Sequence, residues 1–218
     1  MYLLAAATDT ELAPAKKSLG SHRGIDFLNT GVGPVNAAYS LTRYLVQKKE
    51  KVEGVINFGV TGAYLETGLK LLDICLAEKE ILADLGICSA ESVTPLGEEA
   101  LSIQREFDLQ NTLFKKAGRF LKSNDIPFKH GCFVTVNCVS GTQSRGDMLR
   151  TTYQALCENM EGAAIARVCS GFGVECLELR SVSNMVEDRD PSTWQLAEAC
   201  EAAALYSSQI TEYLLKYE

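Results

Sequence analysis

The chain has little of what most metal and redox sites require. It contains only two histidines, His22 and His130, which argues against a histidine-based metal centre. None of its eight cysteines forms a C-x-x-C pair, the spacing typical of zinc and redox sites. Most cysteines have apolar neighbours, as Cys75 does, and this favours reduced, buried thiols over disulfides. We therefore predict no metal site and no cofactor.

The chain also lacks a basic surface and a membrane-length apolar run. Its formal net charge of -7 disfavours a nucleic-acid partner, because phosphates need a basic face. No segment approaches the roughly 18 apolar residues of a membrane span. The N-terminal run Met1–Ala7 has no basic region before it and stops at Thr8, so we interpret it as a buried strand and not as a signal peptide. We expect no membrane partner and a cytoplasmic location.

No Pro-rich or Gly/Ser-rich linker interrupts the 218 residues, and a hydrophobic content of 46% is ample for a core, so we predict one domain over residues 1–218. Short apolar runs alternate with longer amphipathic stretches. The strands are predicted at 2–7, 25–29, 55–58, 71–82, 131–139 and 174–182. Helices are predicted at 35–49, 109–121, 160–168 and 190–217, with a short helix capped by Ser140 and Gln143 and a loop over 84–104. This alternation predicts an α/β domain with a mostly parallel sheet covered on both faces.

Acidic residues stand beside two predicted helix starts. Thr8 with Glu11 is the pattern of a capping box, which is the interpretation that the local sequence favours, and the functional alternative is Glu11 as a general base on a water molecule. Glu161 either interacts with the dipole of its helix or is a shielded carboxylate that binds the two hydroxyls of a ribose. Glu11 directly follows a predicted strand, and strand ends are where α/β folds place their ligands.

Three further clusters admit a structural and a functional interpretation. The turn 30–36 could hold an anion on its amides, but it is not a complete dinucleotide fingerprint and is typical of a tight strand-to-helix turn. Gly59 permits either a bend or the close approach of a ligand. Arg180 on an apolar strand is expected to pair with an acid, and Asn184 is either a turn residue or an amide that reads a base edge.

In this order the clusters resemble the nucleoside phosphorylase/hydrolase superfamily, specifically the nucleosidase branch that includes methylthioadenosine/S-adenosylhomocysteine nucleosidase. A finer resemblance, to the futalosine hydrolases, rests on Leu179–Asn184 with Arg189 and Trp194. The resemblance to the superfamily covers nearly the whole chain. The resemblance implies a three-layer α/β/α sandwich around a mixed, mostly parallel sheet, hydrolysis of an N-ribosidic bond, a purine nucleoside as small-molecule partner, and a homodimer or larger homo-oligomer.

The resemblance also implies roles for individual residues. Glu11 matches the acid/base that acts on the water, and Arg180 the arginine near that water. Met160 and Glu161 match the ribose-binding pair. Val139 and Ser140 lie about where the family flanks the base, with Val139 in place of a common aromatic residue. Gly59 is predicted to contact the substrate.

Asn184 departs from the adenine-specific nucleosidases, which carry an aspartic acid at this position. An amide cannot transfer a proton to the purine N7, but it can donate and accept hydrogen bonds on the edge of a 6-oxopurine. We therefore predict hydrolysis of futalosine to hypoxanthine and dehypoxanthine futalosine in menaquinone biosynthesis. The alternatives are a methylthioadenosine/S-adenosylhomocysteine nucleosidase, a phosphate-dependent phosphorylase and a silent nucleoside sensor. Phosphate would be repelled if both Asp9 and Glu11 face the attack position.

Overall fold

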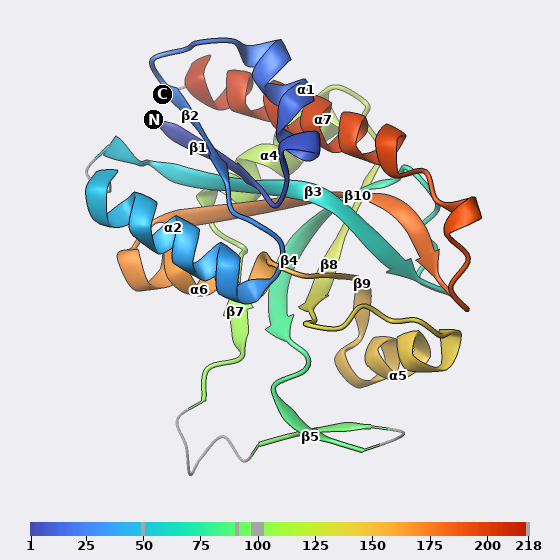
Figure 1. Cartoon of the computed structure of the whole chain (residues 1–218). Coiled ribbons are helices and arrows are strands. Elements are labelled where there is room, and N and C mark those ends of the chain that lie inside the picture. The colour runs from blue at the N-terminus through green and yellow to red at the C-terminus, as the bar shows by residue number, and fades with distance from the viewer. Residues whose placement is uncertain (49–50, 90–91, 97–102, 217–218) are drawn as a thin grey trace.

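In the computed structural model, which describes residues 1–48, 51–89, 92–96 and 103–216, helices cover both faces of a mixed sheet (Figure 1). The strands of the main sheet are β1 (Tyr2–Ala6), β2 (Ile25–Asn29), β3 (Gly54–Tyr64), β4 (Ile74–Leu82), β7 (Glu106–Asp108), β8 (Phe128–Thr135), β9 (Ala155–Asn159) and β10 (Glu175–Val186). A separate hairpin contains β5 (Gly86–Cys88) and β6 (Val93–Pro95). The helices are α1 (Asp9–Leu19), α2 (Pro34–Lys48), α4 (Thr112–Ser123), α5 (Gln143–Tyr153), α6 (Gly162–Phe172) and α7 (Leu196–Lys216).

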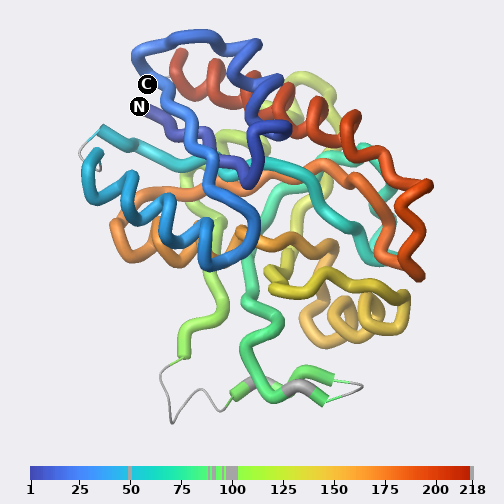
Figure 2. Tube along the Cα trace, in the orientation of Figure 1, coloured from blue at the N-terminus to red at the C-terminus, as the bar shows by residue number. Residues whose placement is uncertain are grey.

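Alternate side chains of β1 enter two different apolar layers. Leu3 and Ala5 pack in the cluster that α2 and α6 cover, whereas Tyr2, Leu4 and Ala6 pack in the cluster that α1, α4 and α7 cover. Figure 2 shows these two groups of helices on opposite sides of the sheet. A strand that is buried on both faces needs apolar residues at every position, which is why the first strand is a continuous apolar run. The predicted three-layer α/β/α architecture is confirmed.

The long strands β3 and β10 run side by side at the centre of the sheet. The first part of β3, Gly54–Asn57, pairs in parallel with β1, while Gly62 and Ala63 near its other end pair with β9 in the antiparallel sense. Strands β10, β4, β8 and β9 complete a path that returns to β3, so this part of the sheet curls on itself. A register shift between Val182 and Asn184 marks a bulge in β10. The curl and the bulge place the middle of β3 and β10 beside the end of β1.

Several predicted boundaries were wrong, and two of the errors concern the site. The predicted strands 55–58 and 174–182 extend as β3 to Tyr64 and as β10 to Val186, so Gly59 and Asn184 lie within strands and not after them. The backbone stays extended there because β3 and β10 remain paired beyond Gly59. Strand β9 was not predicted, because five residues between two helices are too short to show a period.

The other errors lie at turns and helix ends. The short helix predicted from Ser140 is α5, and its cap is Thr142, whose hydroxyl accepts from Arg145 N at 3.3 Å. The C-terminal helix predicted from residue 190 starts instead as a 3-10 turn, Pro191–Thr193, and α7 begins only after the extended Trp194. The predicted loop 84–104 contains the β5–β6 hairpin. Residues 49, 90–91, 97–102 and 217 of the predicted segments lie outside the described residues.

Candidate active site

A cavity of about 410 Å³ lies where β1 ends, where β3 and β10 run past it, and where β9 leads into α6. Seven of the eight residues that the sequence predicts for the site line this cavity, namely Glu11, Val139, Ser140, Met160, Glu161, Arg180 and Asn184. They come from four different elements or loops, which the sheet topology brings together.

The eighth predicted residue, Gly59, is not among the lining residues, so the predicted contact with substrate needs correction. It lies immediately behind two of the lining residues instead. A Cβ atom at this position would approach Glu11 Oε1 to well under 3.0 Å and would lie 3.0 Å from Arg180 Nη1. Gly59 therefore provides the space that these two charged groups occupy.

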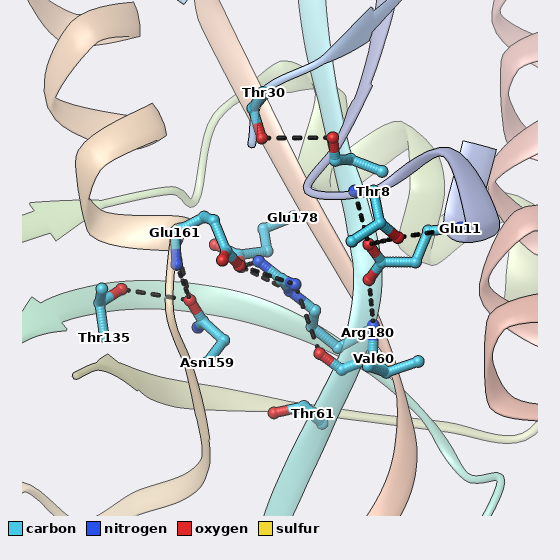
Figure 3. Close-up of polar contacts among 12 residues, drawn as sticks. Thr8, Glu11, Thr30, Val60, Thr61, Thr135, Asn159, Glu161, Glu178 and Arg180 are labelled. Atoms are coloured by element: carbon cyan, nitrogen blue, oxygen red, sulfur yellow. Dashed lines mark hydrogen bonds and ion pairs between the residues drawn. The ribbon is translucent and has the colours of Figure 1, made fainter. Parts of the chain in front are cut away.

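Glu11 combines the two roles that the sequence leaves open. Its Oε2 accepts hydrogen bonds from Thr8 N at 3.0 Å and Thr8 Oγ1 at 2.8 Å, and Thr8 Oγ1 accepts in turn from Glu11 N, which completes a capping box (Figure 3). Its Oε1 accepts from Val60 N at 3.2 Å. Since a carboxylate has about four acceptor positions and three are used, one position remains for a water molecule in the cavity.

Asp9, in contrast, does not stand beside Glu11 at the attack position. Its side chain is 78% exposed and lies 3.5 Å from Lys16 Nζ. The expectation that two carboxylates from this loop face an incoming phosphate is therefore wrong for Asp9, because the first turn of α1 directs it to solvent.

Glu161 occupies the N-cap position of α6 but makes no side-chain capping bond. Its carboxylate points away from the helix, where Oε1 accepts from Gly33 N at 2.9 Å and Oε2 lies 3.7 Å from Arg180 Nη1. The anion that the glycine turn holds is thus a side chain of the protein itself. Burial raises the pKa of Glu161, and the positive charge of Arg180 opposes that rise.

Arg180 is fully buried and paired, as predicted. Its Nε and Nη2 atoms lie 2.9 Å from Glu178 Oε1, and its Nη1 donates to Val60 O at 3.3 Å. The guanidinium therefore stands between Glu178 on one side and Glu161 on the other (Figure 3). The positive charge of Arg180 is therefore paired with acids of the protein itself in the absence of a ligand.

The far end of the cavity holds Asn184 and Ser140 with an acid that the sequence reasoning missed. Glu158 lines the cavity and accepts from Ser140 N at 2.7 Å, Ser140 Oγ at 2.6 Å and Tyr64 OH at 3.0 Å. Asn184 Oδ1 accepts from Ser183 Oγ at 2.9 Å. Two uncharged polar groups and one carboxylate are suited to the polar edge of a base.

Trp194 and Arg189 also line the cavity, with the Arg189 guanidinium 4.5 Å from the centre of the Trp194 ring. The sequence resemblance includes both residues but assigns them no role. Glu158 was missed for a different reason, since it belongs to the unpredicted strand β9. The signal that could have found it is the run Glu158-Asn159-Met160-Glu161, which concentrates polar groups directly before a helix.

Comparison with known proteins identifies the class to which this cavity belongs. The sequence profile of the Phosphorylase superfamily matches residues 25–217. The chain therefore belongs to the phosphorylase superfamily, and the resemblance seen in its sequence is confirmed.

Within that family, the chain is 37% identical to a futalosine hydrolase of Thermus thermophilus over 83% of this chain and 78% of that protein. A futalosine hydrolase of Streptomyces coelicolor is 31% identical, covering 82% of this chain and 75% of that protein. A 5'-methylthioadenosine/S-adenosylhomocysteine nucleosidase of Staphylococcus epidermidis is 27% identical over 90% of this chain and 83% of that protein. The futalosine hydrolases thus share more identity with the chain than this nucleosidase does.

Solved structures confirm the fold. The native futalosine hydrolase of Helicobacter pylori superposes with a TM-score of 0.82 at 19% identity and 97% coverage of both chains. A Helicobacter pylori methylthioadenosine/S-adenosylhomocysteine nucleosidase mutant with 5'-methylthioadenosine in its active site gives 0.84 at 19% identity, again with 97% coverage of both chains.

Proposed function

We propose that this protein hydrolyses the N-ribosidic bond of futalosine and releases hypoxanthine and dehypoxanthine futalosine. The observation that carries the proposal is that Glu11, Glu161 and Asn184, which are far apart in the sequence, line one cavity. The two futalosine hydrolases that share 37% and 31% identity with the chain support the same substrate.

The geometry supports a dissociative hydrolysis. As the bond to the base stretches, the sugar gains positive charge, and a carboxylate beside it stabilises that charge. Glu161 is the carboxylate for this task, because Gly33 N and Arg180 hold it at the cavity wall and its remaining acceptor positions suit the 2′ and 3′ hydroxyls. Glu11, fixed by Thr8 and Val60, orients the attacking water and takes its proton.

Asn184 is proposed to bind the departing base. The Ser183 hydroxyl donates to Asn184 Oδ1, and Asn184 Nδ2 donates to Met185 O at 3.3 Å, so the amide has a preferred orientation and its second N–H is the donor for the base. A donor stabilises the electron density that hypoxanthine gains at N7 or O6, whereas an adenine leaving group requires proton transfer to N7, which an amide cannot supply. A site that pairs with one polar edge discriminates strongly against another.

Water, and not phosphate, is the proposed nucleophile. Glu11, Glu158 and Glu161 are buried acids in the lining, and Arg180 is engaged by Glu178. Three carboxylates in a shielded cavity disfavour a phosphate dianion, because like charges repel strongly where water is excluded.

We further propose that the 218 residues form one catalytic domain and that the enzyme acts in the cytoplasm, in menaquinone biosynthesis. We also propose that it forms a homodimer or a larger homo-oligomer. Val35, Tyr39 and Val46 lie on one outer face of α2, and their side chains are 65–78% exposed. A stripe of large apolar groups on a helix favours burial against another copy of the chain. Among the described residues, no helix has the length and apolar character that crossing a bilayer demands.

A substrate panel tests the proposal. The purified protein is incubated with futalosine, inosine, adenosine or 5'-methylthioadenosine, with and without inorganic phosphate, and the free base is quantified. We expect hypoxanthine from futalosine without phosphate. A strict need for phosphate would make the protein a phosphorylase, faster release of adenine would contradict the role of Asn184, and binding without release would indicate a sensor.

A further inference from the structure

Two acids that the proposed mechanism does not use are fully buried behind the cavity. Glu80 on β4 and Glu178 on β10 have no exposed surface. Their carboxylates meet at the start of α6, because a Cβ atom on Gly162 would lie under 3.0 Å from oxygens of both. Since the oxygens of Glu80 and Glu178 each lie under 3.0 Å from the same Cβ position, they are less than about 6 Å from one another. Buried carboxylates interact strongly at that distance.

One proton bound by Glu80 and Glu178 together is the simplest explanation of how two carboxyl groups can be buried side by side. Ionising two adjacent carboxyl groups that are shielded from water costs a large free energy, because both charges lose their hydration and repel one another. Burial and the charge of Glu178 raise the pKa of Glu80 well above its usual range, while Glu178 itself is paired with Arg180. Among the described side chains, Glu178 Oε2 is a buried oxygen without a hydrogen-bond donor, and the proton of a neutral Glu80 would supply one.

Glu80 anchors the side chains that cap α6. It accepts from Thr135 Oγ1 at 2.8 Å and from Asn159 Nδ2. Thr135 Oγ1 then accepts from Ala163 N at 2.7 Å, and Asn159 Oδ1 accepts from the amides of Glu161 at 3.0 Å and Gly162 at 2.7 Å.

Those bonds replace an ordinary helix cap. The side chain of the N-cap residue usually binds the first free amides of a helix. Here the N-cap residue is Glu161, and side chains from β8 and β9 do that work, which leaves the Glu161 carboxylate free to face the cavity (Figure 3).

Glu178 performs the matching task for Arg180. Its Oε1 lies 2.9 Å from both Nε and Nη2, which directs Nη1 toward Val60 O and Glu161. Its negative charge also offsets that of the guanidinium. Without it, Arg180 would neutralise Glu161 and weaken the stabilisation of a positively charged sugar.

We propose that Glu80 and Glu178 form one positioning unit, with a single proton between them, that fixes Glu161 and Arg180 at the ribose end of the cavity. The inference rests on the proposed ribosidase function. Neither residue touches the cavity, so both act through other groups.

Substitutions at position 80 separate this role from a general structural one. Glu80→Gln keeps a neutral group that can accept from Asn159, whereas Glu80→Leu removes every polar contact. We expect Glu80→Gln to retain kcat within about tenfold of the wild type and Glu80→Leu to lose about 100-fold in kcat, since a displacement near 1 Å costs about that much. Glu78→Gln on the same strand, at a partly exposed acid, is the matched control and should behave as wild type.

Three results would overturn the inference. They are a folded Glu80→Leu protein with unchanged kcat and KM, equal damage in Glu80→Gln and Glu80→Leu, and a Glu80→Leu protein that is merely less stable while its folded fraction turns over normally. If Glu80→Leu does not fold, Thr135→Val tests the same link, because it removes the cap on Ala163 N and the hydroxyl's bonds to Glu80 and Asn159 but leaves both of those side chains in place. We expect it to lower kcat about tenfold with little change in melting temperature, and an unchanged kcat would count against the proposal.

An infrared spectrum gives a readout that does not depend on turnover. At neutral pH we expect the carbonyl band of a protonated carboxyl group in the wild type and in Glu78→Gln, and its loss in Glu80→Gln. If the band is missing in a protein that cleaves futalosine, the shared proton is refuted while the proposed function stands. A band in a protein that cleaves no nucleoside would refute the proposed function and leave the acid pair standing.

Discussion

Gly59→Ala adds a single methyl group behind the two charged groups of the candidate active site. The added carbon would approach Glu11 Oε1 to well under 3.0 Å, a separation that real Cβ atoms essentially never show, and would lie 3.0 Å from Arg180 Nη1. Ordinary contact begins near 3.4 Å, so the Glu11 carboxylate must retreat by about 1 Å. The two Thr8 bonds hold Oε2 in place, so the movement falls on Oε1 and on its bond from Val60 N.

The size of the expected loss in turnover follows from the displacement of the Glu11 carboxylate. A shift of about 1 Å in a catalytic group lowers the rate about 100-fold. Crowding in a packed interior costs about 1–3 kcal/mol of the free energy of unfolding. We therefore expect kcat for base release to fall about 100-fold, with a smaller change in KM, because Glu161 and the ribose end of the cavity are not displaced directly.

The assay combines steady-state release of hypoxanthine with urea unfolding. Gly118→Ala is the matched control, since a Cβ atom there meets its nearest neighbour, Phe128 Cζ, at an ordinary 3.7 Å. That variant should keep wild-type turnover and stability or gain slightly in stability, because alanine favours a helix interior over glycine. A Gly59→Ala enzyme with wild-type kcat would show that the position of Glu11 does not limit catalysis, and the reasoning would fail.

Three further predictions concern the acids and the amide. Glu11→Gln should cut turnover by about two to four orders of magnitude, whereas Asp9→Asn at the exposed neighbour should not, and equal rates for both would leave Glu11 only its capping role. Asn184→Asp should shift the ratio of kcat/KM toward adenosine-type substrates, measured side by side with inosine-type ones, and an unchanged ratio would remove Asn184 from base recognition. Because burial raises the pKa of Glu161 above its ordinary 4.5, kcat/KM should fall as the pH is lowered through a value above 4.5, where the protonated acid loses an acceptor for the ribose. A rate that is flat down to pH 4.5 would contradict this assignment.

Much of the architecture was predictable because local patterns carry it. The apolar run of β1, buried on both faces, and the amphipathic period of α2 are properties of neighbouring residues. The capping box of Thr8 and Glu11 is equally local, and it forms as predicted. The ordered set of polar clusters was also sufficient to recognise the family, which the match over residues 25–217 confirms.

The sequence by itself determined the α/β class, the family and the chemical types of the site residues, since these depend on periodicity and on residue identity along the chain. Only the tertiary structure decided that Gly33 N holds Glu161, 128 residues away, and that Gly59 serves as space instead of as a contact. The tertiary structure alone also brought Glu80 close to Glu178 at the start of α6, behind the cavity. The reason is physical: such contacts depend on which strands become neighbours and where a sheet curls, and those choices are made by packing across the whole core.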